Sequence, residues 1–98
     1  MSTPETVRSS MVHRTATFFE KRPKTRLNNY LMWSRALDRV MRVNKKRGCD
    51  FSPDELFSIL EESLSEASEA VLGRVLTAEE EDDLRARVQS LRTLKGLT

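Results

Sequence analysis

The chain has 98 residues, of which 33% are charged and 38% hydrophobic, with a formal net charge of +2 and one cysteine. No apolar run approaches the ~18 residues of a membrane-spanning helix, and the N-terminus lacks the apolar segment of a signal peptide, so we expect an intracellular protein without a membrane partner. Only three glycines and three prolines accompany many helix-forming residues, which predicts one all-α domain over residues 1–98.

The first helix is predicted at about residues 4–21. Thr3 is suited to accept hydrogen bonds from the first free amides of a helix, and Pro4 is tolerated at the first helical position. The apolar pattern that follows is interrupted by arginines. The alternative is therefore that residues 1–24 form a basic, partly mobile N-terminal arm.

A long amphipathic helix is predicted over residues 26–47, after a break at Pro23. At about 100° per residue its apolar face comprises Leu27, Tyr30, Leu31, Trp33, Leu37, Val40 and Met41, together with Asn44. Met32 and Val43 fall outside this face and among basic residues, which suggests that they contact another protein. Gly48 is placed to end the helix.

Two further helices are predicted over residues 53–72 and 78–95. Ser52 and Glu55 have the spacing of a reciprocal N-terminal cap, and Thr77 with Glu80 repeats it. The short connectors favour antiparallel neighbours, so the expected architecture is a small bundle of three to four helices.

The charges divide the chain into a basic half and an acidic half. Residues 1–50 carry 12 Lys and Arg against 4 Asp and Glu, whereas residues 51–98 carry 5 against 11. Arg35, Arg39, Arg42 and Lys46 recur with helical spacing and form a basic stripe opposite the apolar face. The candidate binding residues are Arg22, Lys24, Arg26, Arg35, Arg39, Arg42, Lys45 and Lys46.

This pattern predicts a non-enzymatic adaptor or regulatory protein that docks on a larger protein partner, such as a viral or bacterial nucleic-acid-handling complex. Three alternatives remain open. In the first, the same residues bind DNA or RNA phosphates directly. In the second, the chain forms homo-oligomers through its opposite charges or through the apolar stripe of its last helix, Leu84, Val88, Leu91 and Leu94. In the third, the basic stripe is solvated or paired with Glu62, Glu66 and Glu69.

No set of residues predicts catalysis, a cofactor or a metal. Cys49 follows a basic run that favours a reactive thiol, but His13 is the only histidine and lies on the least certain element. A metal site normally needs three or four convergent ligands. We therefore expect no enzyme activity, and we interpret Cys49 as a loop residue at a helix corner.

The stretch from Tyr30 to Val75 resembles the Hha/YmoA group of small all-helical nucleoid modulators, which bind a DNA-organising partner. The resemblance consists of YLM, ALDRVMRVNKK, the FSPDEL corner and a longer helix with an acidic face. The stretch alanine-alanine-aspartate-histidine-arginine of that group's middle helix has no match in SILEES at 58–63. The chain is therefore not assigned to this group, and no site is transferred from it.

Overall fold

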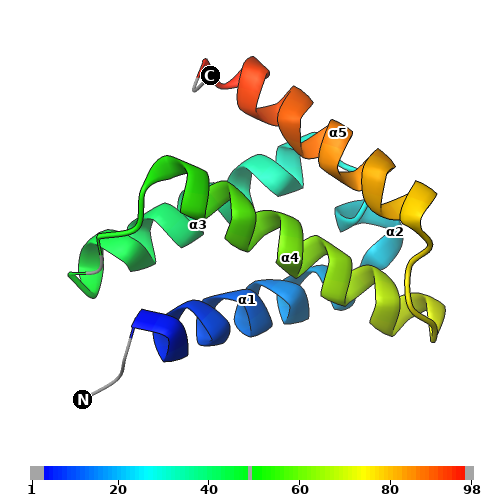
Figure 1. Ribbon diagram of the computed structural model, residues 1–98, viewed down its shortest axis with the longest axis horizontal. Coiled ribbons are helices and arrows are strands. Elements are labelled where there is room, and N and C mark those ends of the chain that lie inside the picture. The colour runs from blue at the N-terminus through cyan, green and yellow to red at the C-terminus, as the bar shows by residue number, and fades with distance from the viewer. Residues whose placement is uncertain (1–3, 49, 97–98) are drawn as a thin grey trace.

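The computed structural model describes residues 4–48 and 50–96 (Figure 1). Its helices are α1 (Pro4–Glu20), α2 (Pro23–Arg26), α3 (Tyr30–Lys46), α4 (Pro53–Leu72) and α5 (Ala78–Leu94). No strand occurs in the two described ranges, so the all-α prediction is confirmed. The predicted ranges of α1, α4 and α5 agree with the structure to within one residue.

Helix α4 is the central element and contacts α1, α3 and α5. Helix α1 runs parallel to it, because ion pairs from Arg8 to Glu62 and from His13 to Glu66 advance along both helices in the same direction. Helices α3 and α5 run antiparallel to α4, as the short connectors predicted (Figure 1).

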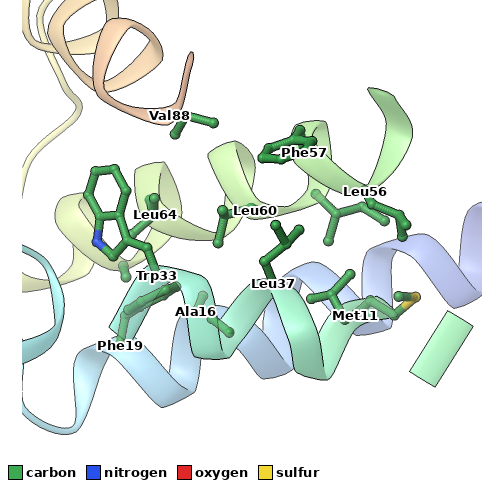
Figure 2. Close-up of a cluster of buried hydrophobic side chains, with 14 of the residues drawn as sticks. Met11, Ala16, Phe19, Trp33, Leu37, Leu56, Phe57, Leu60, Leu64 and Val88 are labelled. Carbon is green, nitrogen blue, oxygen red and sulfur yellow. The ribbon is translucent and has the colours of Figure 1, made fainter. Parts of the chain in front are cut away.

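The core lies around α4 and receives side chains from every long helix. Figure 2 shows Met11, Ala16 and Phe19 of α1 on one side of α4 and Val88 of α5 on the other. The fully buried large side chains include Phe19, Trp33, Leu37, Ile59, Leu60, Leu64 and Val88. Burying one such side chain contributes about 1.5–3 kcal/mol, so these contacts dominate the stability of the fold.

Helix α1 is tied to α4 by polar contacts as well as by its buried face. Arg8 forms ion pairs with Glu55 and Glu62, and its Nη2 donates a hydrogen bond to Ser58 Oγ at 2.9 Å. Val7 is 8% exposed at the same end of the helix. The described part of residues 1–24 is thus largely helical and packed, while the mobile arm stays a prediction about dynamics.

The predicted start of the second long helix at residue 26 is wrong, because α3 begins at Tyr30. Asn29 is extended, and its side chain accepts a hydrogen bond from the Leu31 amide at 2.9 Å, which starts α3 anew. The preceding residues form the short helix α2. Its last turn is held by Trp33, whose Nε1 donates to the carbonyls of Arg26 and Leu27 at 3.0 and 3.1 Å.

The buried face of α3 is rotated from the predicted one towards α1. Tyr30, Leu31 and Met41, expected inside, are 38%, 57% and 41% exposed. Met32 and Val43, expected to be exposed, are half-buried, and Val43 packs against the core. The reason is that α1 lies along the side of α3 that carries Met32 and Val43.

Local signals define the corners on either side of α4. Ser52 Oγ accepts a hydrogen bond from the Glu55 amide at 3.3 Å, but the Glu55 carboxylate pairs with Arg8 instead of completing the predicted reciprocal cap. The cap formed by Thr77 and Glu80 is complete. Between these helices Gly73 has a φ of 72°, a left-handed conformation that favours glycine.

Protonation of Glu80 is expected to weaken the α4–α5 connector only below pH 4.5. Hydrogen bonds from the Arg74 guanidinium, and then from the Thr77 amide, lower the pKa of the Glu80 carboxyl from 4.5 to about 2. A carboxyl with a lower pKa in the folded state contributes stability above its unfolded pKa and loses that contribution as the pH falls through the folded pKa. The affected window is therefore pH 4.5 to about 2.

An NMR titration of the Glu80 carboxyl carbon measures this effect. Arg74→Gln is expected to raise the Glu80 pKa towards 4.5, because it removes the strongest hydrogen bond that lowers it. Lys95→Gln, which removes a distant ion pair to Asp38, serves as the control and leaves the Glu80 pKa unchanged. A Glu80 pKa that stays near 2 in Arg74→Gln would contradict the role given to Arg74.

Candidate functional site

Ten exposed cations between residues 14 and 47 form what we call the basic surface. They lie on α1, α2 and α3 and on the residues that join or follow these helices. They are Arg14, Lys21, Arg22, Lys24, Arg35, Arg39, Arg42, Lys45, Lys46 and Arg47. Within residues 4–48 and 50–96, none of the ten forms an ion pair with a carboxylate. The charges of this surface are therefore available to a partner.

The acidic residues of α4 do not neutralise the basic surface, because each has a partner elsewhere. Arg92 binds Asp54 (2.5 Å), Arg8 binds Glu55 and Glu62, Arg85 binds Glu61 (3.0 Å), and His13 lies 3.5 Å from Glu66. Glu69 accepts a hydrogen bond from the Leu76 amide at 3.0 Å. The alternative in which Glu62, Glu66 and Glu69 pair with the stripe is therefore wrong.

Helix α3 presents the predicted stripe of Arg35, Arg39, Arg42 and Lys46, and all four side chains are exposed. Their spacing keeps them on one face of a helix of 3.6 residues per turn. Lys45 and Lys46 also lie in the last turn, where positive charge is favoured by the helix dipole. The stripe is thus compatible with a stable helix.

Arg26 differs from the other predicted site residues, because it is half-buried and already bonded. Its Nη1 donates to the Phe18 carbonyl at 2.6 Å, and its guanidinium lies 4.1 Å from the centre of the Phe18 ring. These contacts fasten α2 to the end of α1. Arg22, which precedes α2, and Lys24, which lies within it, remain exposed.

Two recesses lie between α1 and α3, which run antiparallel to each other. The larger, of about 170 Å³, is lined by Thr15, Phe18, Arg26, Met32, Arg35, Ala36 and Arg39. The smaller, of about 40 Å³, is lined by Ser10, Met11, Arg14, Thr15, Arg39, Val40, Val43 and Arg47. Since both include Thr15 and Arg39, they are consecutive parts of one surface, which we call the α1–α3 groove. Its floor is largely apolar and its rim carries arginines.

The groove divides the predicted site residues into two groups. Arg26, Arg35 and Arg39 line it, whereas Arg22, Lys24, Arg42, Lys45 and Lys46 line neither recess. Arg14 and Arg47 line it but are missing from the predicted set. Val43 lines the smaller recess with them, and Met32 lines the larger one. The position of these two apolar residues among cations was the sequence signal for the groove, because it predicted a protein contact.

The other candidate residues form no chemical centre in the described chain. Cys49 lies outside the described residues. His13 is exposed, and residues 4–48 and 50–96 contain no group of three metal-binding side chains. Most of the apolar stripe of α5 packs in the core, because Leu84, Val88 and Leu91 are buried.

A membrane-spanning segment is also missing among these residues, since no described helix combines the necessary length and apolar character. Comparison with known protein families, with characterised proteins and with solved structures gives no match to this chain.

Proposed function

We propose that this protein is a small adaptor or regulatory protein that binds an acidic region of a larger protein through its basic surface. The observation that carries the proposal is the absence of carboxylate partners for the ten described cations, although all six acidic residues of α4 are engaged. Charge complementarity with an acidic partner increases the association rate and selects against basic partners.

The apolar floor of the α1–α3 groove favours a protein partner over a nucleic-acid backbone. Phosphate contacts need cations but gain little from half-buried side chains such as Phe18, Met32 and Val43. An interface between proteins uses both kinds of group, with apolar residues at its centre and charged residues at its rim. The partner then belongs to a larger assembly, for which a nucleic-acid-handling complex is one candidate.

Direct binding to DNA or RNA is the second candidate function. The stripe on α3 favours it, because four exposed cations on one helix face match the repeated charges of a phosphate backbone. Binding of this kind would weaken steeply with salt and would depend little on sequence.

Affinity capture from cells that make the protein, with and without nuclease, tests the proposal. The expected result is one protein retained under both conditions, whose purified form binds this chain more weakly at higher salt. A nonspecific DNA duplex is titrated in parallel at two salt concentrations. Capture that disappears with nuclease, together with duplex binding at low salt, would replace the proposal with the nucleic-acid alternative. Failure to retain any protein would reject the adaptor role.

A further inference from the structure

We infer that the α1–α3 groove is the binding site for an acidic amphipathic segment of the partner. One bulky apolar side chain of this segment occupies the larger recess, and its carboxylates bind the arginines of the rim. This inference rests on the proposed function and names the chemistry of the partner that the basic surface binds. It follows from the volume of the recess, from the type and spacing of the rim residues and from the engagement of this chain's own acids.

The volume of the larger recess fits one side chain. It measures about 170 Å³, and an apolar cavity of about 150 Å³ in a protein accepts a molecule the size of benzene. Pockets for small-molecule ligands are larger, roughly 300–1,000 Å³. Phe18, Met32 and Ala36 supply the apolar walls. The flexible Met32 side chain adapts to the shape of the group that enters.

The rim is built from arginine, and no lysine of the basic surface lines either recess. A guanidinium binds a carboxylate with two parallel hydrogen bonds, which fixes direction as well as charge. Arg14, Arg35, Arg39 and Arg47 are exposed and have no described carboxylate partner. Arg26 is held against Phe18 and also lines the larger recess.

The length of the groove sets the length of the segment that it binds. Arg35 lies on α3, and Arg47 is the residue that caps the C-terminus of this helix. They are twelve positions apart, which corresponds to roughly 18 Å at the helical rise of about 1.5 Å per residue. A partner helix of about twelve residues covers the same distance. Carboxylates one turn apart on that helix then face Arg35 and Arg39, with the apolar anchor between α1 and α3.

Among the described residues of a second copy, the exposed apolar residues nearest to the acidic start of α5 are Val71, Leu72 and Val75, which lie at the end of α4 and in the connector and not on the acidic helix itself. The acids of α4 are engaged with α1, with α5 or with the connector that follows α4. In α5 the large apolar residues Leu84, Val88 and Leu91, which follow the acidic start of the helix, are buried. The segment is therefore assigned to a different protein.

Photo-crosslinking of the captured complex, with methionine replaced by photo-methionine, tests whether the partner segment binds in the α1–α3 groove. Met32 lines the larger recess, whereas Met41 lies on the same helix, is 41% exposed and lines neither recess, so it is a control within the same molecule. The expected result is an adduct from Met32 to a partner segment that carries acidic residues within one turn of a bulky apolar residue. Adducts from Met41 are expected to be rare. Circular dichroism of the labelled protein verifies that it is folded.

Two arginine variants supply a second measurement that does not depend on labelling. Arg39→Gln removes the arginine shared by both recesses and is expected to weaken partner binding roughly tenfold or more. Arg42→Gln removes the same charge from a position of the basic surface outside the groove, so it is expected to weaken binding less than Arg39→Gln does, by about threefold.

The outcomes separate this inference from the proposed function. A captured partner that crosslinks through Met41 and not Met32, or that responds equally to Arg39→Gln and Arg42→Gln, overturns the groove and leaves the adaptor role standing. A Met32 adduct to a second copy, to nucleic acid or to a segment without acidic residues also overturns it. If no protein is captured before irradiation, the proposed function and the inference fail together.

Discussion

Simultaneous replacement of Arg35, Arg39 and Arg42 by glutamate is expected to abolish partner capture while leaving the melting temperature nearly unchanged. The three side chains are exposed and have no ion pair in the described chain, so their replacement breaks no ion pair between the helices. Exposed substitutions of this kind usually change stability by no more than about 0.5 kcal/mol each. Against an acidic partner, each reversal converts an attraction into a repulsion.

A pair of triple variants with equal net charge distinguishes the location of the charge from its total. Arg35→Gln, Arg39→Gln and Arg42→Gln together lower the net charge by the same amount as Ala86→Glu, Gln89→Glu and Ser90→Glu on exposed positions of α5. Capture should weaken in the first variant and persist in the second. Equal losses in both variants would show that binding responds to net charge alone. A collapse of the melting temperature in the glutamate variant would mean that the stripe stabilises the fold.

Replacement of Trp33 by alanine is expected to have the largest effect on stability, a loss of about 3–5 kcal/mol from a total that is typically about 5–15 kcal/mol. The indole is completely buried, and its ring lies 5.3 Å from that of Tyr30 and 4.9 Å from the Arg87 guanidinium. Its Nε1 also supplies hydrogen bonds to two carbonyls at the end of α2. The substitution thus opens a cavity and releases the α2 turn.

Urea unfolding followed by far-UV circular dichroism measures this loss. Trp33→Phe keeps a ring but removes the two hydrogen bonds, so it should cost less, about 1–3 kcal/mol. Tyr30→Ala is the matched aromatic control, because Tyr30 is 38% exposed and its loss should cost about 1 kcal/mol. Equal unfolding midpoints for Trp33→Ala and Tyr30→Ala would contradict the central place given to Trp33.

The helix ends could be predicted because their signals are local. Ser52 and Thr77 start α4 and α5, and Gly73 follows the last residue of α4, as the sequence indicated. The four-residue helix α2 was missed because it depends on Trp33, which holds its last carbonyls from the next helix. A pattern of apolar residues cannot reveal a turn that is stabilised by a side chain seven positions later.

The candidate site could likewise be predicted only where its signals lie within one segment of the chain. The stripe on α3 follows from helical spacing within one segment, so Arg35 and Arg39 were identified. Arg14 and Arg47 are 33 positions apart and come together only because α1 and α3 run antiparallel. The rotation of α3 that half-buries Met32 has the same cause, since it depends on where α1 packs. Neither feature is encoded in the periodicity of a single helix.

The parallel packing of α1 on α4 has a consequence for synthesis of the chain. Arg8 and its partner Glu62 are 54 residues apart, with α2 and α3 between them. A ribosome that adds about 5–20 residues per second needs roughly 3–11 s to cover that distance. During this interval the apolar face of α1, which includes Met11 and Phe19, lacks α4, its main packing partner, and can meet only α2 and α3. The nascent chain therefore passes through a stage in which it is exposed to chaperones and to aggregation before α4 emerges.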